Sequence, residues 1–253
     1  MRVGIYVDAF NVYYGGRSLV AGGPAGASWK WLDLGGLCDA LIDRALWPDA
    51  HVARLVYCSA PRSATGDVLG SQDQRRYFDA LRYRAGDEGY DFLLELGYYV
   101  HTEKSGLLLT GRREPPIPWA HVLEERELPS WLALRPKHHV DGSVYALGSF
   151  RTFEEKGTDV NVATHLTADV CGGTIDAAVV VSNDSDLALP VSLARMVVPV
   201  GHVNPSARPT AGRLRGLPGD GAGRHWWRRL AIGDFVSHQL PSPCGGVERP
   251  DDW

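Results

Sequence analysis

Cysteine is scarce in this chain, and its spacing argues against two kinds of stabilising site. The 253 residues include four cysteines, and no two of them form a C-x-x-C pair. Structural zinc sites and disulfide frameworks need closely or regularly spaced cysteines. We therefore expect neither of them. The expected reduced thiols, with packing or surface roles, are Cys38, Cys58, Cys171 and Cys244.

Long apolar runs are also missing. No stretch approaches the roughly 20 apolar residues that a membrane helix needs. The first residues follow a strand pattern and not the basic segment and apolar core of a signal peptide. We expect a cytoplasmic protein that does not bind a membrane. The formal net charge of −4 argues against indiscriminate coating of nucleic acids, although it leaves local basic grooves open.

Several motifs of well-known enzymes are absent. The sequence has no G-x-x-x-x-G-K-[ST] phosphate loop, no G-x-G-x-x-G after a strand, and no pattern that supports a Ser-His-Asp triad. Nucleotide-driven chemistry is therefore not expected. The histidines of the middle region lack zinc-ligand spacing, which favours ordinary surface or core roles for them. They are His101, His121, His138, His139 and His165.

Strand and helix patterns alternate along most of the chain. Apolar runs predict strands at 2–8, 51–58, 90–100, 175–181 and 197–203. Helical spacing of apolar residues predicts helices near 34–42, 72–83, from 159 onward, 187–195 and 230–236. This alternation favours an α/β fold with a mainly parallel sheet and helices on both faces. Residues 101–150 interrupt it with several prolines, so we expect an irregular insertion there, which leaves room for short strands.

Four carboxylates stand where this fold would bring them together. Asp8 ends the first apolar run, Asp184 and Asp186 follow the run Ala177–Val181, and Asp159 begins a helix. The carboxyl ends of parallel strands meet at one edge of the sheet, where ligands bind. Facing carboxylates repel unless a cation lies between them, and Mg²⁺ takes a few carboxylates together with water and phosphate oxygens. The sequence therefore predicts a metal-dependent phosphodiester site.

Neighbouring polar residues extend this candidate site, and each also has a purely structural interpretation. Asn11 shares the turn after Asp8, and residues 182–186 offer hydroxyls and an amide through Ser182 and Asn183. Such residues also cap helices, and Asp159 in a first turn also complements the helix dipole. Lys156 would contact a scissile phosphate or neutralise the acids, or else form a structural salt bridge.

A basic, glycine-rich stretch lies between residues 207 and 229. It contains a single acid, Asp220, and ends near Trp226 and Trp227. Its arginines are Arg208, Arg213, Arg215, Arg224, Arg228 and Arg229. Flexible positive loops of this composition would suit RNA phosphates and bases. The alternative is a solvated surface loop whose tryptophans pack onto the body of the protein.

Three linked motifs resemble the NYN domain family, the bacterial branch of the PIN-like (PilT N-terminus) nuclease superfamily. They are Val3–Asn11, Glu155–Asn161 and Val180–Leu187, followed by Val203–Pro205. The resemblance extends to about residue 240. It implies a single PIN-like domain over 1–240, a three-layer α/β/α sandwich around a mainly parallel sheet. The segments at about 101–150 and 207–229 are then insertions, and 241–253 is a C-terminal tail.

The resemblance also implies roles for individual residues. Asp8 and Asp184 would be the main ligands of Mg²⁺ or Mn²⁺, and Asp159 and Asp186 would complete the catalytic site directly or through water. Other polar residues would orient the ligand or contact the substrate. They are Asn11, Lys156, Ser182, Asn183 and Asn204.

We therefore expect a Mg²⁺- or Mn²⁺-dependent ribonuclease, a hydrolase that cleaves RNA internally. The metal would lower the pKa of a bound water and stabilise charge on the phosphate. One alternative is an RNA-binding or regulatory module with little catalysis. Another is a phosphatase or DNA nuclease, because a metal held by carboxylates does not by itself choose among phosphate esters. A homodimer or a protein partner is left open.

Overall fold

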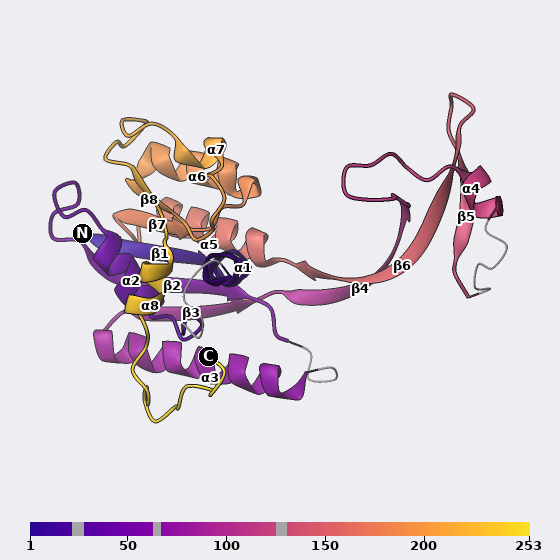
Figure 1. Ribbon diagram of the computed structural model, residues 1–253. Coiled ribbons are helices and arrows are strands. Elements are labelled where there is room, and N and C mark those ends of the chain that lie inside the picture. Colours follow the sequence, from indigo (N-terminus) through magenta and orange to yellow (C-terminus); the bar gives the residue numbers. More distant parts are fainter. Residues whose placement is uncertain (22–27, 63–66, 125–130) are drawn as a thin grey trace. The chain divides into compact units, whose positions relative to one another are not determined.

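The computed structural model describes residues 1–21, 28–62, 67–124 and 131–253, and the chain divides into two compact units (Figure 1). The larger unit combines Met1–Tyr98 with Lys156–Trp253, and the smaller unit is Tyr99–Glu155. All the residues predicted to form the site belong to the larger unit. The predicted single domain over 1–240, with its insertions and its C-terminal tail, stays a prediction.

A six-stranded sheet forms the centre of the larger unit. Its strands in spatial order are β3 (Asp91–Leu96), β2 (His51–Ser59), β1 (Arg2–Asp8), β7 (Ala177–Val181), β8 (Val200–Asn204) and β9 (Trp226–Arg229). Each neighbouring pair runs parallel. Parallel strands covered on both faces are apolar throughout, and β7 is buried at every residue. The predicted α/β class with a mainly parallel sheet is confirmed.

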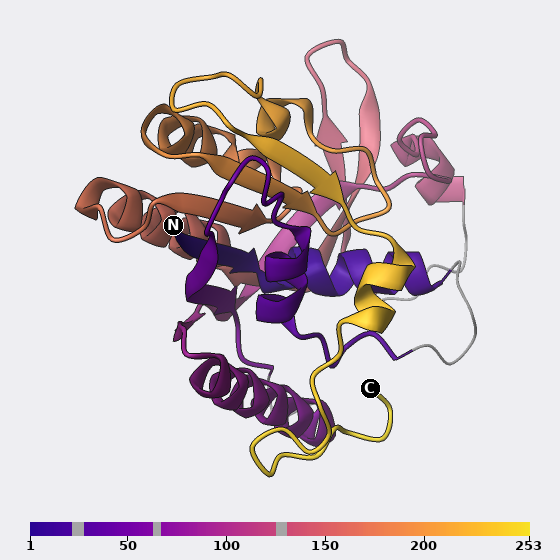
Figure 2. The ribbon, with the colours of Figure 1, turned by 90° about the vertical axis from the view of Figure 1, so that its left-hand side faces the viewer.

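Helices pack against both faces of this sheet, because successive strand side chains point to opposite sides. Val7 belongs to one hydrophobic core and Tyr6 to the other. The first core is closed by α1 (Ala9–Val20), α2 (Leu34–Leu41), α3 (Val68–Glu88) and α8 (Ile232–Ser237). The second is closed by α5 (Thr158–Gly172), α6 (Ala188–Val197) and α7 (Gly212–Arg215). In Figures 1 and 2, α3 and α6 lie on opposite sides of the strands.

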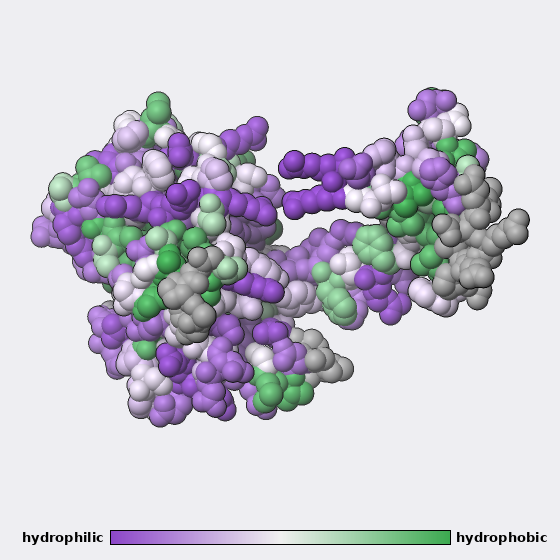
Figure 3. Space-filling view, viewed as in Figure 1, coloured by the Kyte–Doolittle hydropathy of each residue, from purple (hydrophilic) through white to green (hydrophobic). Residues whose placement is uncertain are grey.

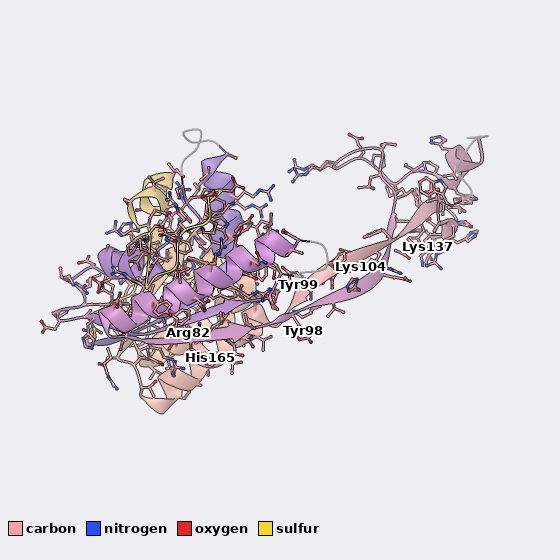
Figure 4. The ribbon with its side chains drawn as sticks, turned by 90° about the horizontal axis from the view of Figure 1, so that it is seen from below. Arg82, Tyr98, Tyr99, Lys104, Lys137 and His165 are labelled. Atoms are coloured by element: carbon pink, nitrogen blue, oxygen red, sulfur yellow. The ribbon has the colours of Figure 1, made fainter. Side chains whose placement is uncertain are left out.

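The smaller unit contains a second sheet with the order β4-β6-β5. Its elements are β4 (Tyr98–Leu107), α4 (Trp119–Glu124), β5 (Leu134–His138) and β6 (Val144–Lys156). Strands β5 and β6 pair antiparallel. Ion pairs join β4 to β6: Lys104, labelled in Figure 4, pairs with Glu154, and Arg151 lies 3.2 Å from Glu103.

The prediction of one continuous strand over 90–100 is wrong. Strand β3 ends at Leu96, and β4 begins at Tyr98 in the other sheet. Between them the backbone N–H of Gly97 donates to the carbonyl of Ser59 at 2.7 Å, which ends the pairing of β3 with β2. The run of residues 90–100 gives no sign of this division in the sequence. Both β3 and β4 are partly buried, so the same mixture of apolar and polar residues continues from one strand into the other.

The basic stretch is not a loop throughout, which corrects the prediction for its last part. Trp226 begins β9, which pairs with β8 and becomes the sixth strand of the sheet. The Trp226 ring packs against Trp47, with the ring centroids 5.4 Å apart. A side chain on Gly201 would collide with this ring, because a Cβ there would lie 2.2 Å from Trp226 Cζ2. Packing of Trp226 therefore holds this segment against the sheet, whereas the alternative interpretation expected a loop with both tryptophans packed, and Trp227 is 44% exposed.

All four cysteines are free: Cys171 is exposed and the other three are buried. None of the helices in the described ranges combines the length and the apolar character that crossing a bilayer requires. Hydrophilic side chains cover much of the visible face of the larger unit (Figure 3).

Candidate functional site

The polar residues predicted from the sequence meet at the carboxyl edge of the sheet. Val7 is paired with Val181, and Val181 is paired with Val203, so β1, β7 and β8 end side by side. Asp8, Ser182 and Asn204 therefore leave three adjacent strands at the same level. A topology that inserts β1 between β2 and β7 makes this meeting possible, because it brings the first strand next to one that follows about 170 residues later.

Asp8 is the buried centre of the site, with 1% of its surface exposed. Its Oδ1 accepts hydrogen bonds from the backbone N–H groups of Phe10 and Asn11, both at 3.0 Å, and so caps α1. Its Oδ2 accepts from Asn11 Nδ2 at 2.5 Å and from Ser182 Oγ at 3.0 Å. Burial raises the pKa of the Asp8 carboxyl, the hydrogen bonds oppose this shift, and the charge of Asp184 adds to it.

These four bonds decide how well Asp8 suits a metal ion. A carboxylate offers about four lone-pair sites, and here four donors use them. A divalent ion would have to displace Asn11 or Ser182 from Asp8. Over the ranges that the structure describes, no three side chains of His, Cys, Asp or Glu form a group that could hold a metal. As the side chains stand, protein donors fill the acceptor positions of Asp8, and the predicted metal ligands stay a prediction.

Ser182 and Asn11 connect Asp8 to the loop after β7. Ser182 Oγ donates to Asp8 and accepts from the backbone N–H of Asp184 at 3.1 Å. Asn11 Oδ1 accepts from the backbone N–H of Asn183 at 3.1 Å. Behind them, His202 Nε2 lies 2.7 Å from the Ser182 carbonyl, and burial lowers the pKa of His202 to about 4. A neutral imidazole therefore donates to this carbonyl and supports the loop.

Asp184 presents a carboxylate oxygen at this edge. The residue is half-buried, and its Oδ1 accepts from the backbone N–H of Asp186 at 3.0 Å, which caps a 3-10 turn at Ser185–Leu187. Its Oδ2 accepts no hydrogen bond from the part of the chain that the structure describes. Asp186 is exposed, and its backbone holds Asp184 in place. Asp8 and Asp184 are thus close neighbours, whereas Asp186 lies on the solvent side.

Asp159 lies in the first turn of α5, near enough to Cys58 for its charge to act on that thiol. Burial raises the pKa of the Cys58 thiol to about 12, and the charges of Asp8, Glu95 and Asp159 raise it further. The acids therefore surround the end of β2. Lys156 is exposed at the end of β6, and both Lys156 and Asp159 take part in interactions of their own.

Three further residues lie near this edge: the sequence analysis assigned Cys58 and His165 ordinary packing, surface or core roles and did not single out Glu95. Cys58 is paired with Asp8 across β1 and β2 and with Glu95 across β2 and β3. His165 Nε2, on α5, lies 3.1 Å from Glu95 Oε2; the residue is labelled in Figure 4. Glu95, like Asp8, stands near the carboxyl end of its strand, but β3 is only partly buried, so the rule that identified Asp8 indicates Glu95 less clearly.

Asn183 and Asn204 use their side chains to fasten the loop that leads into the basic stretch. Asn183 Oδ1 accepts from the N–H of Ala211 at 2.9 Å, and its Nδ2 donates to the carbonyl of Pro209 at 3.2 Å. Asn204 Nδ2 donates to the carbonyl of Arg208 at 2.9 Å. The substrate contacts predicted for Asn183 and Asn204 stay predictions. In the structure both side-chain amides position a loop.

Comparison with known proteins points to a different chemistry from the one predicted. No family model matches the chain. The 6-hydroxy-3-succinoylpyridine 3-monooxygenase of Pseudomonas putida is 28% identical over 275 aligned positions, which cover 100% of this chain and 75% of that protein. A solved structure of a protein of unknown function from Vibrio parahaemolyticus covers 90% of this chain and 92% of its own, with a TM-score of 0.44 and 15% identity.

The prediction of a metal-dependent ribonuclease is therefore wrong, and so are the nuclease and hydrolase assignments that went with it. The similarity that runs along the whole chain is to a monooxygenase, which is an oxidoreductase. The described residues also contain no cluster of metal ligands that would support the hydrolytic mechanism. Asp8 and Asp184 do lie close together, but Asn11 and Ser182 donate hydrogen bonds to the Asp8 oxygen that was predicted to bind the metal.

Proposed function

We propose that this chain is an oxidoreductase that uses O2 to hydroxylate a hydroxy-substituted pyridine or a closely related nitrogen heterocycle. The observation that carries the proposal is the similarity along 100% of the chain to a 6-hydroxy-3-succinoylpyridine 3-monooxygenase. At a ring C–H such a reaction converts C–H, O2, two electrons and two protons into C–OH and water. At a ring carbon that carries an acyl group, as position 3 of 6-hydroxy-3-succinoylpyridine does, the acyl group leaves as an aldehyde, and O2, four electrons and four protons give the ring hydroxyl, the aldehyde and one water. A reductant and an oxygen-activating cofactor supply the electrons and the reactive oxygen.

The carboxyl edge offers the groups that such a ring needs. Asp184 Oδ2 is open to accept the proton of a ring hydroxyl, and removing that proton makes the ring more electron-rich and easier to oxidise. Asp8 is a positioning residue, since it holds Ser182, and Ser182 Oγ in turn accepts from the N–H of Asp184. The fixed donors in this buried network keep Asp184 in place without reorganisation during the reaction.

Some predictions from the sequence remain proposals. They are membership of the NYN domain family with its PIN-like three-layer sandwich, a cytoplasmic location, a bound Mg²⁺ or Mn²⁺, RNA as a binding partner, and a homodimer or protein partner. The location was predicted from the absence of apolar runs, the oligomeric state was left open, and the others rest on the resemblance. A metal at Asp8 requires that Asn11 or Ser182 move away from its Oδ2. Titration with Mg²⁺ or Mn²⁺ beside an Asp8→Asn variant tests that site directly.

The proposed activity is tested with 6-hydroxy-3-succinoylpyridine as the probe substrate. The purified chain is supplied with NADH or NADPH, with and without added FAD or FMN, under isotopically labelled O2. We expect substrate-dependent O2 uptake and one labelled oxygen atom in the product. Asp184→Asn removes the proton acceptor and is expected to lower kcat about a hundredfold, the usual order for loss of a general base.

The matched control is Asp79→Asn, which makes the same chemical change at a half-exposed surface acid paired with Arg82. We expect it to turn over like the unaltered protein. Absence of O2 uptake with every combination of reductant and flavin would refute the oxygenase assignment. If Asp79→Asn and Asp184→Asn lower kcat equally, Asp184 is not the proton acceptor and the active site does not lie at the carboxyl edge of the sheet.

A further inference from the structure

The strand β9 presents an aromatic and cationic face on the side of α7. Trp226 packs into the first core, so the alternation of a strand turns Trp227 and Arg229 toward the opposite face. The Arg215 guanidinium, at the end of α7, lies 4.3 Å from the centre of the Trp227 ring. Although Arg215 covers part of the ring, 44% of Trp227 remains exposed. This face therefore combines an open indole with guanidinium groups.

The positive charge of this face is not neutralised from within the protein. The arginines between residues 207 and 229 form no ion pair with any acid in the described ranges. The acid within the stretch, Asp220, uses its Oδ2 to accept from the N–H of Leu217 at 2.8 Å. Arg215 and Arg229 are exposed. Their charge is available to an anion from solution.

The same face continues to the candidate site. Arg229 is paired with Asn204 in the parallel register, so their side chains project from the same side of the sheet. Asn204 holds the Arg208 carbonyl at 2.9 Å and so brings the start of the basic stretch to the carboxyl edge. Three strand spacings of about 4.8 Å separate β1 from β9, which places Trp227 ~14 Å from the strand of Asp8.

We propose that this face binds a nucleoside phosphate, with the base stacked on the exposed part of Trp227 and the phosphate held by Arg215 and Arg229. Guanidinium groups match phosphate oxygens with paired, charge-assisted hydrogen bonds. An aromatic ring binds the flat face of any base. The phosphate-binding glycine loops are missing from this sequence, so at this face side chains would recognise the nucleotide.

The observations favour a small nucleotide over a nucleic acid. Proteins that bind single strands stack successive bases on several aromatic rings along a basic groove. On this face of β9 and α7 the stacking ring is Trp227, and the half-buried Asp184 and exposed Asp186 at the neighbouring edge would repel a longer phosphate chain. The net charge of −4 points the same way.

This inference goes beyond the proposed function and does not depend on it. If the chain is the proposed oxygenase, the occupant is a nicotinamide dinucleotide that brings electrons toward the carboxyl edge. Binding is measured without turnover, so the two ideas fail separately. If nucleotides bind but no oxygenation occurs, the nucleotide site is supported and the proposed function is refuted. If oxygenation occurs and substitutions on this face do not change it, the proposed function is supported and the nucleotide site is refuted.

The test is calorimetric titration of the full chain with ADP, NADH, NADPH and inorganic phosphate. We expect nucleotides to bind more tightly than phosphate alone, and binding to weaken as salt rises. Arg229→Ala and Trp227→Ala are each expected to raise the Kd for ADP about tenfold. Trp227→Phe keeps an aromatic ring, so we expect it to bind ADP nearly as tightly as the unaltered protein. This result would show that Trp227→Ala weakens binding through lost stacking and not through misfolding.

Arg228→Ala is the matched control, because it removes the same charge from the adjacent residue on the opposite face of β9. We expect it to bind ADP like the unaltered protein. An equal loss in Arg228→Ala and Arg229→Ala would overturn the site and indicate diffuse charge attraction. The proposal is also overturned if a short single-stranded RNA binds while none of the nucleotides does.

Discussion

Replacing Tyr6 with phenylalanine tests the buried polar network that ties β1 to α5. Tyr6 is fully buried, and its hydroxyl donates to Asp169 Oδ2 at 2.8 Å. Asp169 Oδ1 accepts from Arg54 Nη1 at 2.9 Å and from Thr174 Oγ1 at 3.1 Å. Burial and the hydrogen bond to Asp169 raise the pKa of Tyr6 well above its usual range, so the hydroxyl stays protonated and keeps donating.

Tyr6→Phe keeps the ring and its packing but leaves a buried carboxylate oxygen without its donor. A hydrogen bond to a charged group contributes about 1.5–3 kcal/mol, so we expect the free energy of unfolding to fall by ~2 kcal/mol. For a chain of this size that change lowers Tm by roughly 4–8 °C. Urea titration measures the free energy, and a thermal scan measures Tm.

The control is Tyr14→Phe, since the Tyr14 side chain is 58% exposed and the same hydroxyl is removed there. We expect its effect to stay within about 0.5 kcal/mol. In an Asp169→Asn background Tyr6→Phe should cost less, because the acceptor is then uncharged. The argument is refuted if Tyr6→Phe is as mild as Tyr14→Phe, or if its cost is the same with and without the Asp169 charge.

Three further changes have definite expected results. Gly201→Ala places a Cβ 2.2 Å from Trp226 Cζ2, and overpacking of this kind should lower the free energy of unfolding by about 1–3 kcal/mol in urea titration; an unchanged midpoint would contradict the packing of β9. Burial lowers the pKa of His202 from 6.5 to about 4, so the unfolded chain binds a proton that the folded one refuses. Stability from this residue is present above pH ~6.5 and is lost as pH falls toward ~4, by about 2 kcal/mol at pH ~5. His202→Gln should remove that part of the pH dependence, and an identical profile in the variant would refute the assignment. A thiol reagent should modify Cys171 rapidly in the folded protein and the three buried cysteines only after unfolding, and fast reaction of a second thiol would contradict the burial.

The class of the fold followed from local patterns alone. Apolar runs ending in polar residues predicted β1, β2, β7 and β8, because strands covered on both faces are apolar throughout. The same rule placed Asp8 and Ser182 at one edge of the sheet. It failed at Gly97, since a change of sheet within an apolar run depends on which backbone groups the next strand pairs with. It failed again at Trp226, whose strand forms through contact with Trp47, far away in the sequence.

The chemistry of the site depended on contacts that no spacing reveals. The sequence placed four acids near one another, and from that we inferred a cation. Only the tertiary structure shows that Asp8 directs its oxygens at the turn of α1 and at Ser182, which fills its acceptor sites.

What the sequence by itself determined is the alternating α/β pattern, the free cysteines and the edge at which the polar residues gather. What only the tertiary structure decided is the partner of each polar atom, the separate sheet of Tyr99–Glu155 and the face on β9 that joins Trp227 to Arg215. The physical reason is the distance along the sequence over which each interaction acts. Strand and helix patterns arise from neighbours within a few residues, whereas a carboxylate's hydrogen bonds depend on groups that folding brings from distant parts of the chain.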